Sequence, residues 1–327
     1  MNTDIQITKN GVRCNAGSIS IYLDPKNTDS QGINFISHAH ADHLPSKNGG
    51  MILTSAETAK IASLRGFKIQ DHIEEADYAS LVDSGHVLGS KGILFGDVFY
   101  TGDICTRNRG FLSGARIPKC KTLIMECTFG LPEFIFPEIK DVQRRVNELI
   151  SEMYNRGIPV ILLGYQLGKS QTLTQLFGHW GPLYLHDSVM QMNQLHQSLG
   201  VQLKNGMSHS EAQKRGMLDK KPWLMIAPTM SSKNKFIVDM KSRYGAVTIG
   251  FSGWAQSNKF AIGKSADYFF PLSDHCDFAE LVDVAVRSGA EQIYTVHGFV
   301  SEFAQSLQKM GINARPMHKR VPDDFIV

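Results

Sequence analysis

The stretch Phe35-Ile-Ser-His-Ala-His-Ala-Asp-His-Leu44 joins the end of an apolar strand to three histidines and an aspartate. Imidazole and carboxylate are the ligands that zinc-type metals prefer. Ligands at this spacing cannot all face one ion from a regular helix, but a loop at a strand end can direct them to two ions. Ala39 and Ala41 keep such a loop narrow. The stretch therefore predicts a two-metal site at the end of a strand.

Further candidate ligands follow other expected strands. His86 lies between two glycines, and Asp103 comes just after an expected strand at 93–100. His275 and His297 stand at the ends of two later apolar runs. Proteins of the α/β class place their sites at the carboxyl ends of strands. The repeated position therefore favours one shared site over scattered capping or core residues.

The remaining pattern predicts an α/β fold, since short β-rich runs alternate with helical stretches. Expected strands cover 33–37, 93–100, 121–126, 159–165, 182–186, 223–227, 246–251, 268–271 and 293–297. Expected helices lie near 56–65, 138–156, 168–178, 187–199, 230–243, 277–288 and 300–310. In the second of these helices the apolar residues recur at the period of 3.6 that marks one helix face.

Composition narrows the class of protein. The chain has 327 residues, of which 42% are hydrophobic, and its net charge is +3. These values exclude a disordered protein and a nucleic-acid binder that relies on bulk charge alone. Five cysteines form no disulfide framework, and the first ten residues lack the apolar core of a signal peptide. We therefore expect a cytoplasmic protein that does not associate with membranes.

A basic segment follows Asp103. Residues 106–121 carry five cations and no acidic residue, and Arg107 and Arg109 lie nearest the expected metal site. Lys169, near an expected helix start, is a further candidate phosphate contact, although the glycine spacing before it does not fit a P-loop. We expect Arg107, Arg109 and Lys169 to bind a polyanionic substrate.

The order of these motifs resembles the metallo-β-lactamase superfamily. Glu126, His275 and His297 resemble motifs A, B and C of its β-CASP branch, whose members are nucleases. The runs GHVLGS (85–90) and LSDHCDF (272–278) are similar to a group of exonucleases associated with DNA ligase, and archaeal-type mRNA 3′-end processing factors share the overall pattern.

This resemblance implies a metallo-β-lactamase αββα sandwich with an inserted α/β cap. The expected core is built from 1–130 and 252–327, and the expected β-CASP cap covers 131–251. The implied cofactors are two Zn²⁺ ions, for which Mn²⁺ can substitute.

The resemblance also implies the ligand of each ion. One zinc is expected on His38, His40 and His86. The other is expected on Asp42, His43 and His297, with Asp103 bridging both ions.

Three further residues complete the implied catalytic set. Asp24 would orient the site, and His275 paired with Glu126 would assist the leaving group. Two metals roughly 3.5–4 Å apart would activate a bridging hydroxide for attack on phosphorus, with Asp42 among the catalytic residues. The expected function is a di-zinc exonuclease on single-stranded ends or flaps in DNA repair, with a DNA ligase or helicase as a partner.

Three alternatives remain open from the sequence. The first is an RNA-processing exo- or endoribonuclease, which is favoured because His297 is the motif C residue typical of RNA-processing members. The second is a small-molecule metallohydrolase such as a lactonase or thioesterase, against which the Glu126 and His275 pair argues. The third is a silent scaffold subunit, which the complete set of expected ligands disfavours.

Overall fold

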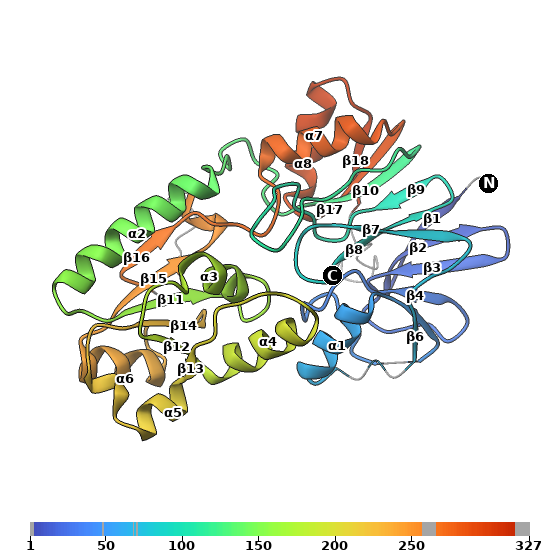
Figure 1. Ribbon diagram of the computed structural model, residues 1–327. Helices are drawn as coiled ribbons and strands as arrows, with labels where there is room; N and C mark the ends of the chain where they lie inside the picture. The colour runs from blue at the N-terminus through green and yellow to red at the C-terminus, as the bar shows by residue number, and fades with distance from the viewer. Residues whose placement is uncertain (1–2, 48, 68, 70, 257–265, 318–327) are drawn as a thin grey trace, which may run out of the picture. The chain divides into compact units, whose positions relative to one another are not determined.

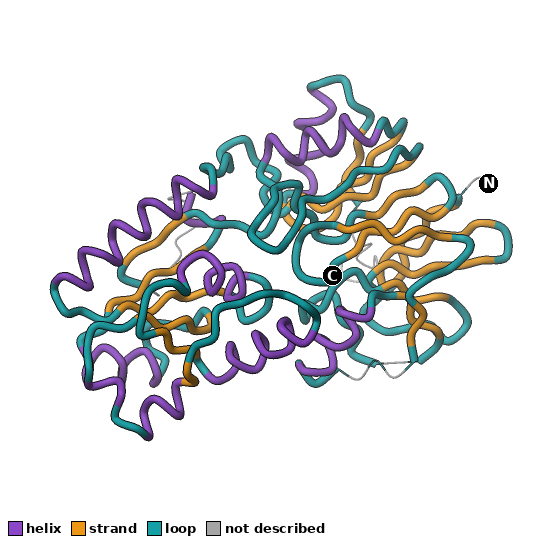
Figure 2. Tube along the Cα trace, viewed as in Figure 1, coloured by secondary structure: helices purple, strands orange, loops and turns teal. Residues whose placement is uncertain are grey.

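The structure is a computed structural model that describes residues 3–47, 49–67, 69, 71–256 and 266–317. It divides into two compact units (Figure 1). Unit 1 comprises residues 1–107, 113–132 and 275–327, and unit 2 comprises 108–112 and 133–274. The described strands form three six-stranded sheets (Figure 2). The chain is therefore of the mixed α/β class.

Unit 1 contains two of these sheets. In spatial order the first consists of β1 (Asp4–Thr8), β2 (Gly11–Ala16), β3 (Ile19–Leu23), β4 (Ile33–Phe35), β5 (Met51–Leu53) and β6 (His72–Ile73). The second consists of β18 (Ala314–Pro316), β17 (Gln292–Gly298), β10 (Thr122–Cys127), β9 (Val98–Tyr100), β8 (Lys91–Phe95) and β7 (Ala79–Asp83). Its helices are α1 (Ala56–Leu64), α7 (Phe278–Ser288) and α8 (Val300–Lys309).

The two sheets of unit 1 pack face to face. Leu23 and Phe35 of the first sheet share one buried cluster with Phe95 and Ile124 of the second. The other face of the second sheet is covered by α7 and α8, which contribute residues such as Phe303 to a separate core (Figure 1). Because apolar residues on both faces of β10 are buried, this strand lies at the centre of the unit.

Unit 2 is a three-layer α/β unit around one parallel sheet. The sheet order is β13 (Met207–Ser208), β12 (Leu183–Leu185), β14 (Leu224–Pro228), β11 (Val160–Gly164), β15 (Val247–Phe251) and β16 (Tyr268–Phe270). On one face lie α2 (Ile139–Asn155), α3 (Lys169–Phe177) and α4 (Asp187–Ser198). On the other lie α5 (His209–Lys214) and α6 (Lys235–Tyr244). Two 3-10 turns complete the elements, at Met217–Asp219 and Gly253–Gln256.

The structure departs from the expected elements in two places. The single strand expected at 93–100 is a hairpin, β8 and β9, because Gly96 takes a φ of 59° and provides the tight turn. Residues 252–256 and 266–274, expected in the core, group with unit 2, whose sheet they extend through β16. In addition, the first three strands and several short ones were not predicted.

None of the helices in the described part of the chain combines the length and the hydrophobicity that spanning a bilayer requires.

A core substitution in unit 2 tests the packing of α2. Ile150 is fully buried between this helix and the sheet, whereas Ile135 of the same unit is 46% exposed. We expect Ile150→Ala to lower the free energy of unfolding by about 2–5 kcal/mol, since it leaves a cavity. Ile135→Ala is the matched control and should cost about 1 kcal/mol or less. Denaturant unfolding of both variants measures this, and equal losses would contradict the packing described.

Candidate metal centre

Four donor atoms converge at the ends of β4, β7 and β9. The Nε2 atoms of His38 and His86 each lie 3.1 Å from Nδ1 of His40. The Asp103 Oδ2 atom lies 3.5 Å from Nε2 of His38 and 3.6 Å from Nε2 of His86. Zn–N bonds of about 2.0–2.1 Å in a tetrahedron separate neighbouring ligands by roughly 3.3 Å. The four side chains are thus spaced as the ligands of one such ion, and their imidazole and carboxylate chemistry fits it.

The second expected group centres on His43. Its Nε2 atom lies 3.5 Å from Oδ1 of Asp103 and 3.7 Å from Oδ2 of Asp42. The ring of His297 follows at a centroid distance of 5.1 Å. Asp103 therefore directs one carboxylate oxygen to each group. Burial lowers the pKa of His43, but Asp103 and Asp24 outweigh this effect and raise it to about 10, which shows how strongly the local negative charge favours a cation.

Asp24 supports His43, the central residue of the second expected group, by contacting the Nδ1 atom of its ring. Its carboxylate accepts hydrogen bonds from the Ser37 backbone N–H at 2.7 Å, the Ser37 hydroxyl at 2.6 Å and the Tyr100 hydroxyl at 2.8 Å. It also lies 2.8 Å from Nδ1 of His43. A carboxylate on one ring nitrogen fixes the tautomer and turns the other nitrogen toward the metal position. Asp24 thus orients His43 toward Asp103.

Two residues of this centre have strained backbone conformations. Among the described residues, the non-glycine residues with positive φ are Asp24, at 41°, and His297, at 54°. Such conformations cost of order 1–3 kcal/mol each and persist where the surroundings impose them. At His297 the pairing of β17 with β10 shifts register, and a bulge of this kind re-aims a side chain.

Glu126 and His275 form a pair beside the first group. The Nδ1 atom of His275 lies 2.8 Å from Oε1 of Glu126, and its ring centroid lies 4.4 Å from that of His86. Burial raises the pKa of Glu126, but His275 and the N–H groups of Ile104 and Thr128 outweigh it and lower the pKa to about 2. Glu126 is therefore a buried carboxylate that holds the Nδ1 atom of His275.

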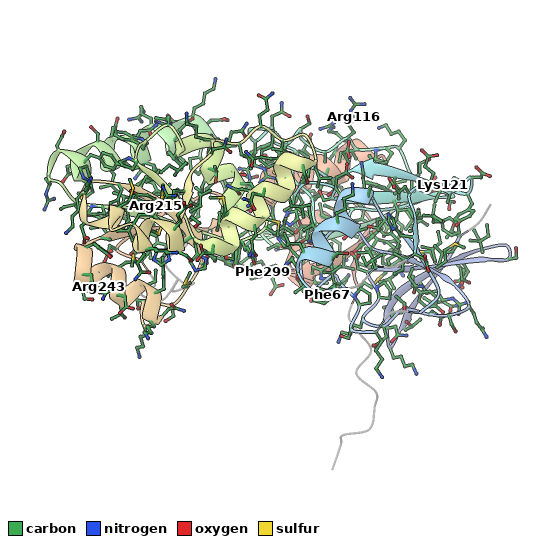
Figure 3. The ribbon with its side chains drawn as sticks, turned by 60° about the horizontal axis from the view of Figure 1, so that its bottom comes forward. Phe67, Arg116, Lys121, Arg215, Arg243 and Phe299 are labelled. Carbon is green, nitrogen blue, oxygen red and sulfur yellow. The ribbon has the colours of Figure 1, made fainter. Side chains whose placement is uncertain are left out.

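Other protein groups hold the three cations that were expected to contact phosphate. Arg109 and Lys169 are 1% and 2% exposed, and both pair with Asp274 in unit 2. Arg107 donates to the His275 carbonyl oxygen at 2.8 Å and pairs with Glu280. These side chains therefore point into the protein instead of lining an open surface. By contrast, Arg116 and Lys121 of the same basic segment are exposed (Figure 3).

Sequence reasoning missed three residues that support the centre. Ser37 and Tyr100 hydrogen-bond Asp24, and Arg65 at the end of α1 donates to the carbonyl oxygen of Ala39, between two of the histidines. Ser37 stands directly before His38, a position that could have singled it out. Tyr100 and Arg65 carry no local signal, because only the folded chain brings them to the centre.

Two cysteines near the centre act as buried neutral groups. Cys127 and Cys276 are fully buried, and burial raises the pKa of each thiol well above its ordinary value. A reactive cysteine needs a lowered pKa and access to solvent. Both residues therefore fill space beside Glu126 and His275.

Asp24→Asn tests the orienting role of this carboxylate. The change keeps the size of the side chain but removes the charge that holds His43, so we expect metal affinity to fall about 10- to 100-fold. Competition with a chelator measures this loss. Asp283→Asn, at an exposed aspartate on α7, is the control. Unchanged affinity in Asp24→Asn would show that His43 does not depend on it.

The chain shows similarity to known proteins, although no family model matches it. It is 30% identical, in an alignment of 297 positions that covers 86% of the chain, to a protein named probable DNA ligase from Opitutus terrae. Shorter matches reach the transcription termination factor FttA (28% identical, 36% of the chain) and an RNase J-like protein (31%, 30% of the chain), both from Methanocaldococcus jannaschii. The chain spans 28%, 21% and 25% of the lengths of these three relatives.

A solved structure shares the fold. The crystal structure of a protein of unknown function from Enterococcus faecalis V583 is 13% identical, matches with a TM-score of 0.62, and the match covers 94% of each chain. The names of these relatives and the cluster of His38, His40, His86 and Asp103 in unit 1 support the same family. The chain therefore belongs to the metallo-β-lactamase/β-CASP nuclease family.

Proposed function

We propose that the chain is a two-metal phosphodiesterase that hydrolyses nucleic acid. One observation carries this proposal. The Asp103 carboxylate meets three sets of side chains. It lies within 4.8 Å of the His38, His40 and His86 donors and forms a similarly close set with Glu126 and His275, and its Oδ1 atom lies 3.5 Å from Nε2 of His43. A metal position and a histidine that a carboxylate holds are thus adjacent, which suits bond cleavage that needs both charge neutralisation and proton transfer.

In this proposal unit 1 is the metallo-β-lactamase core and unit 2 is the β-CASP cap. The face-to-face sheets of unit 1 and their outer helices support the first assignment. The insertion of a complete parallel α/β unit at 133–274 supports the second.

The proposed ligands follow the two groups around Asp103. His38, His40 and His86 would hold one Zn²⁺ ion, since their donor atoms and Asp103 are mutually close. Asp42, His43 and His297 would hold the other, since His43 lies near Asp42, Asp103 and the His297 ring. When bound, such a pair of ions supplies a nucleophile at neutral pH and neutralises charge on the phosphoryl oxygens. Mn²⁺ accepts the same oxygen and nitrogen donors and is a second candidate.

His275 would protonate the leaving oxygen. Glu126 lies 2.8 Å from its Nδ1 atom, so the carboxylate fixes the ring and leaves Nε2 to carry the exchanged proton. Because Glu126 is fully buried and accepts two backbone N–H groups as well, it holds this orientation without moving. In this proposal His275 is the general acid and Glu126 is the group that positions it.

Single-stranded DNA ends or flaps are the proposed substrate. The longest match, covering 86% of the chain, is to a protein named as a DNA ligase, which supports a role beside DNA joining and a ligase as partner. RNA is the second candidate, because the shorter matches are to an RNase J-like protein and a transcription termination factor.

A side-by-side cleavage assay tests the proposal. End-labelled single-stranded DNA and matched RNA are incubated with zinc- or manganese-loaded wild type, with Asp42→Ala and with Asp283→Ala. The Asp42 side chain is 80% exposed, so its removal should disturb the site and leave the fold intact. We expect DNA cleavage by wild type and by the Asp283→Ala control, and its loss in Asp42→Ala.

The outcomes separate the alternatives. Cleavage of RNA alone would assign the chain to RNA processing, and the product ladder would give polarity in either case. Cleavage of neither by a protein that holds two metals would contradict the nuclease proposal and favour a small-molecule metallohydrolase.

A further inference from the structure

His275 follows directly after Asp274, and each of these two residues is held by its own set of charged side chains. Asp274 is the last residue of unit 2, and His275 is the first residue of the segment that returns to unit 1. The set in unit 2 contacts the Asp274 side chain, and the set in unit 1 contacts the His275 main chain. Each set lies within its own unit.

In unit 2, Asp274 is held by two buried cations. Arg109 pairs with its Oδ1 atom, and the Lys169 Nζ atom lies 3.0 Å from its Oδ2 atom. Lys169 also donates to the Leu272 carbonyl oxygen at 2.6 Å. All three charged side chains are at most 6% exposed. Burying ions is costly unless each meets a partner in good geometry, so this arrangement fixes the Asp274 carboxylate in one place.

In unit 1, Arg107 holds the next residue. Its Nη2 atom donates to the His275 carbonyl oxygen at 2.8 Å, and its Nε atom lies 3.2 Å from Oε1 of Glu280. Glu280 in turn accepts from the Asp277 N–H at 2.9 Å, while the Asp277 side chain accepts from the Glu280 N–H in a capping box at the start of α7. The guanidinium fork thus ties His275 to the first turn of a helix.

The two contacts act on residues whose Cα atoms are about 3.8 Å apart, and only the φ and ψ angles between them can relax. Glu126 fixes the imidazole of His275 at the other end. We propose that Arg107, Arg109 and Lys169 are positioning residues that set the place of His275, and that they do not bind phosphate. This inference rests on the proposed function, because the position matters only if His275 takes part in cleavage.

Kinetics distinguish a positioning residue from a phosphate contact. Arg107→Met and Lys169→Met should each lower kcat about 10- to 100-fold, with KM unchanged, because a small displacement of the reacting group costs rate without weakening binding. A phosphate contact would instead raise KM and reduce the salt slope of binding by about 0.7 for single strands. Lys169→Met leaves the Arg109–Asp274 pair in place, so the folded state should survive.

Arg107→Lys sharpens this comparison. Lysine keeps the positive charge but cannot span the His275 carbonyl and Glu280 with a rigid fork. Positioning therefore predicts that Arg107→Lys loses kcat much as Arg107→Met does, whereas a phosphate contact predicts that lysine retains most activity. Arg116→Met, at an exposed arginine of the same segment, is the control and should leave kcat unchanged.

A second measurement does not depend on activity. Long-range ¹H–¹⁵N spectra of the histidine rings in the metal-loaded protein report the environment of His275, which is assigned by comparison with His275→Gln. We expect its signals to shift in Arg107→Lys and Lys169→Met and to stay in place in Arg116→Met. Unmoved signals together with raised KM would overturn the inference. If wild type cleaves no nucleic acid, the proposed function fails, and shifted His275 signals would still establish the positioning.

Discussion

Asp103→Ala is expected to release both metal ions and to reduce cleavage below detection. One oxygen of this carboxylate lies 3.5–3.6 Å from the donor nitrogens of His38 and His86, and the other lies 3.5 Å from that of His43. A single substitution therefore removes a ligand from both groups and leaves a buried set of imidazoles without its shared negative charge. Elemental analysis of the purified variant, together with the cleavage assay, measures the effect.

Asp283→Ala is the control for this variant, since it removes an exposed carboxylate that pairs with Arg287 on the same helix. It should bind two metal ions and cleave at the wild-type rate. Retention of both ions and of turnover by Asp103→Ala would rule out the shared-ligand arrangement.

His275→Ala is expected to keep both metal ions and to slow cleavage by about 10²-fold or more. Its Nδ1 atom contacts Glu126, and the group of His38, His40, His86 and Asp103 is complete without it, although His275 also lies close to Asp103. Loss of a general acid typically costs 10²–10⁴-fold in rate. Single-turnover cleavage and elemental analysis of the same preparation measure both quantities.

His72→Ala is the matched control, because this histidine is partly exposed on β6 and pairs only loosely with Glu74. It should behave as wild type. Loss of one metal ion from His275→Ala would show that His275 is a ligand, and an unchanged rate would remove it from the proposed reaction.

Most strands and helices of unit 2 could be predicted because their apolar patterns are strong, whereas the short β13 and α5 were not predicted. The parallel strands are buried on both faces and read as continuous apolar runs, as Val160–Gly164 shows. The helix Ile139–Asn155 buries one face at the expected period. In unit 1 the strands at 4–8 and 11–16 escaped prediction, because most of their residues are partly or fully exposed and apolar and polar residues mix along them.

The candidate site shows the same contrast. Candidate ligands that cluster in sequence, such as His38 and His40, can be singled out from their spacing and their chemistry, and the structure brings their donor atoms together. The ion pairs of Arg109 and Lys169 with Asp274 could not be predicted. In sequence, a cation on an exposed loop looks the same as a cation that pairs with a buried carboxylate. Only the folded chain shows that Arg109 contacts a carboxylate 165 residues away in the sequence.

The most direct test of the two-metal account is anomalous scattering at the zinc edge from crystals of the zinc-loaded wild type. We predict two peaks about 3.5–4 Å apart, one among His38, His40 and His86 and one beside His43, with Asp103 contacting both. A single peak, or peaks away from these residues, would contradict the account.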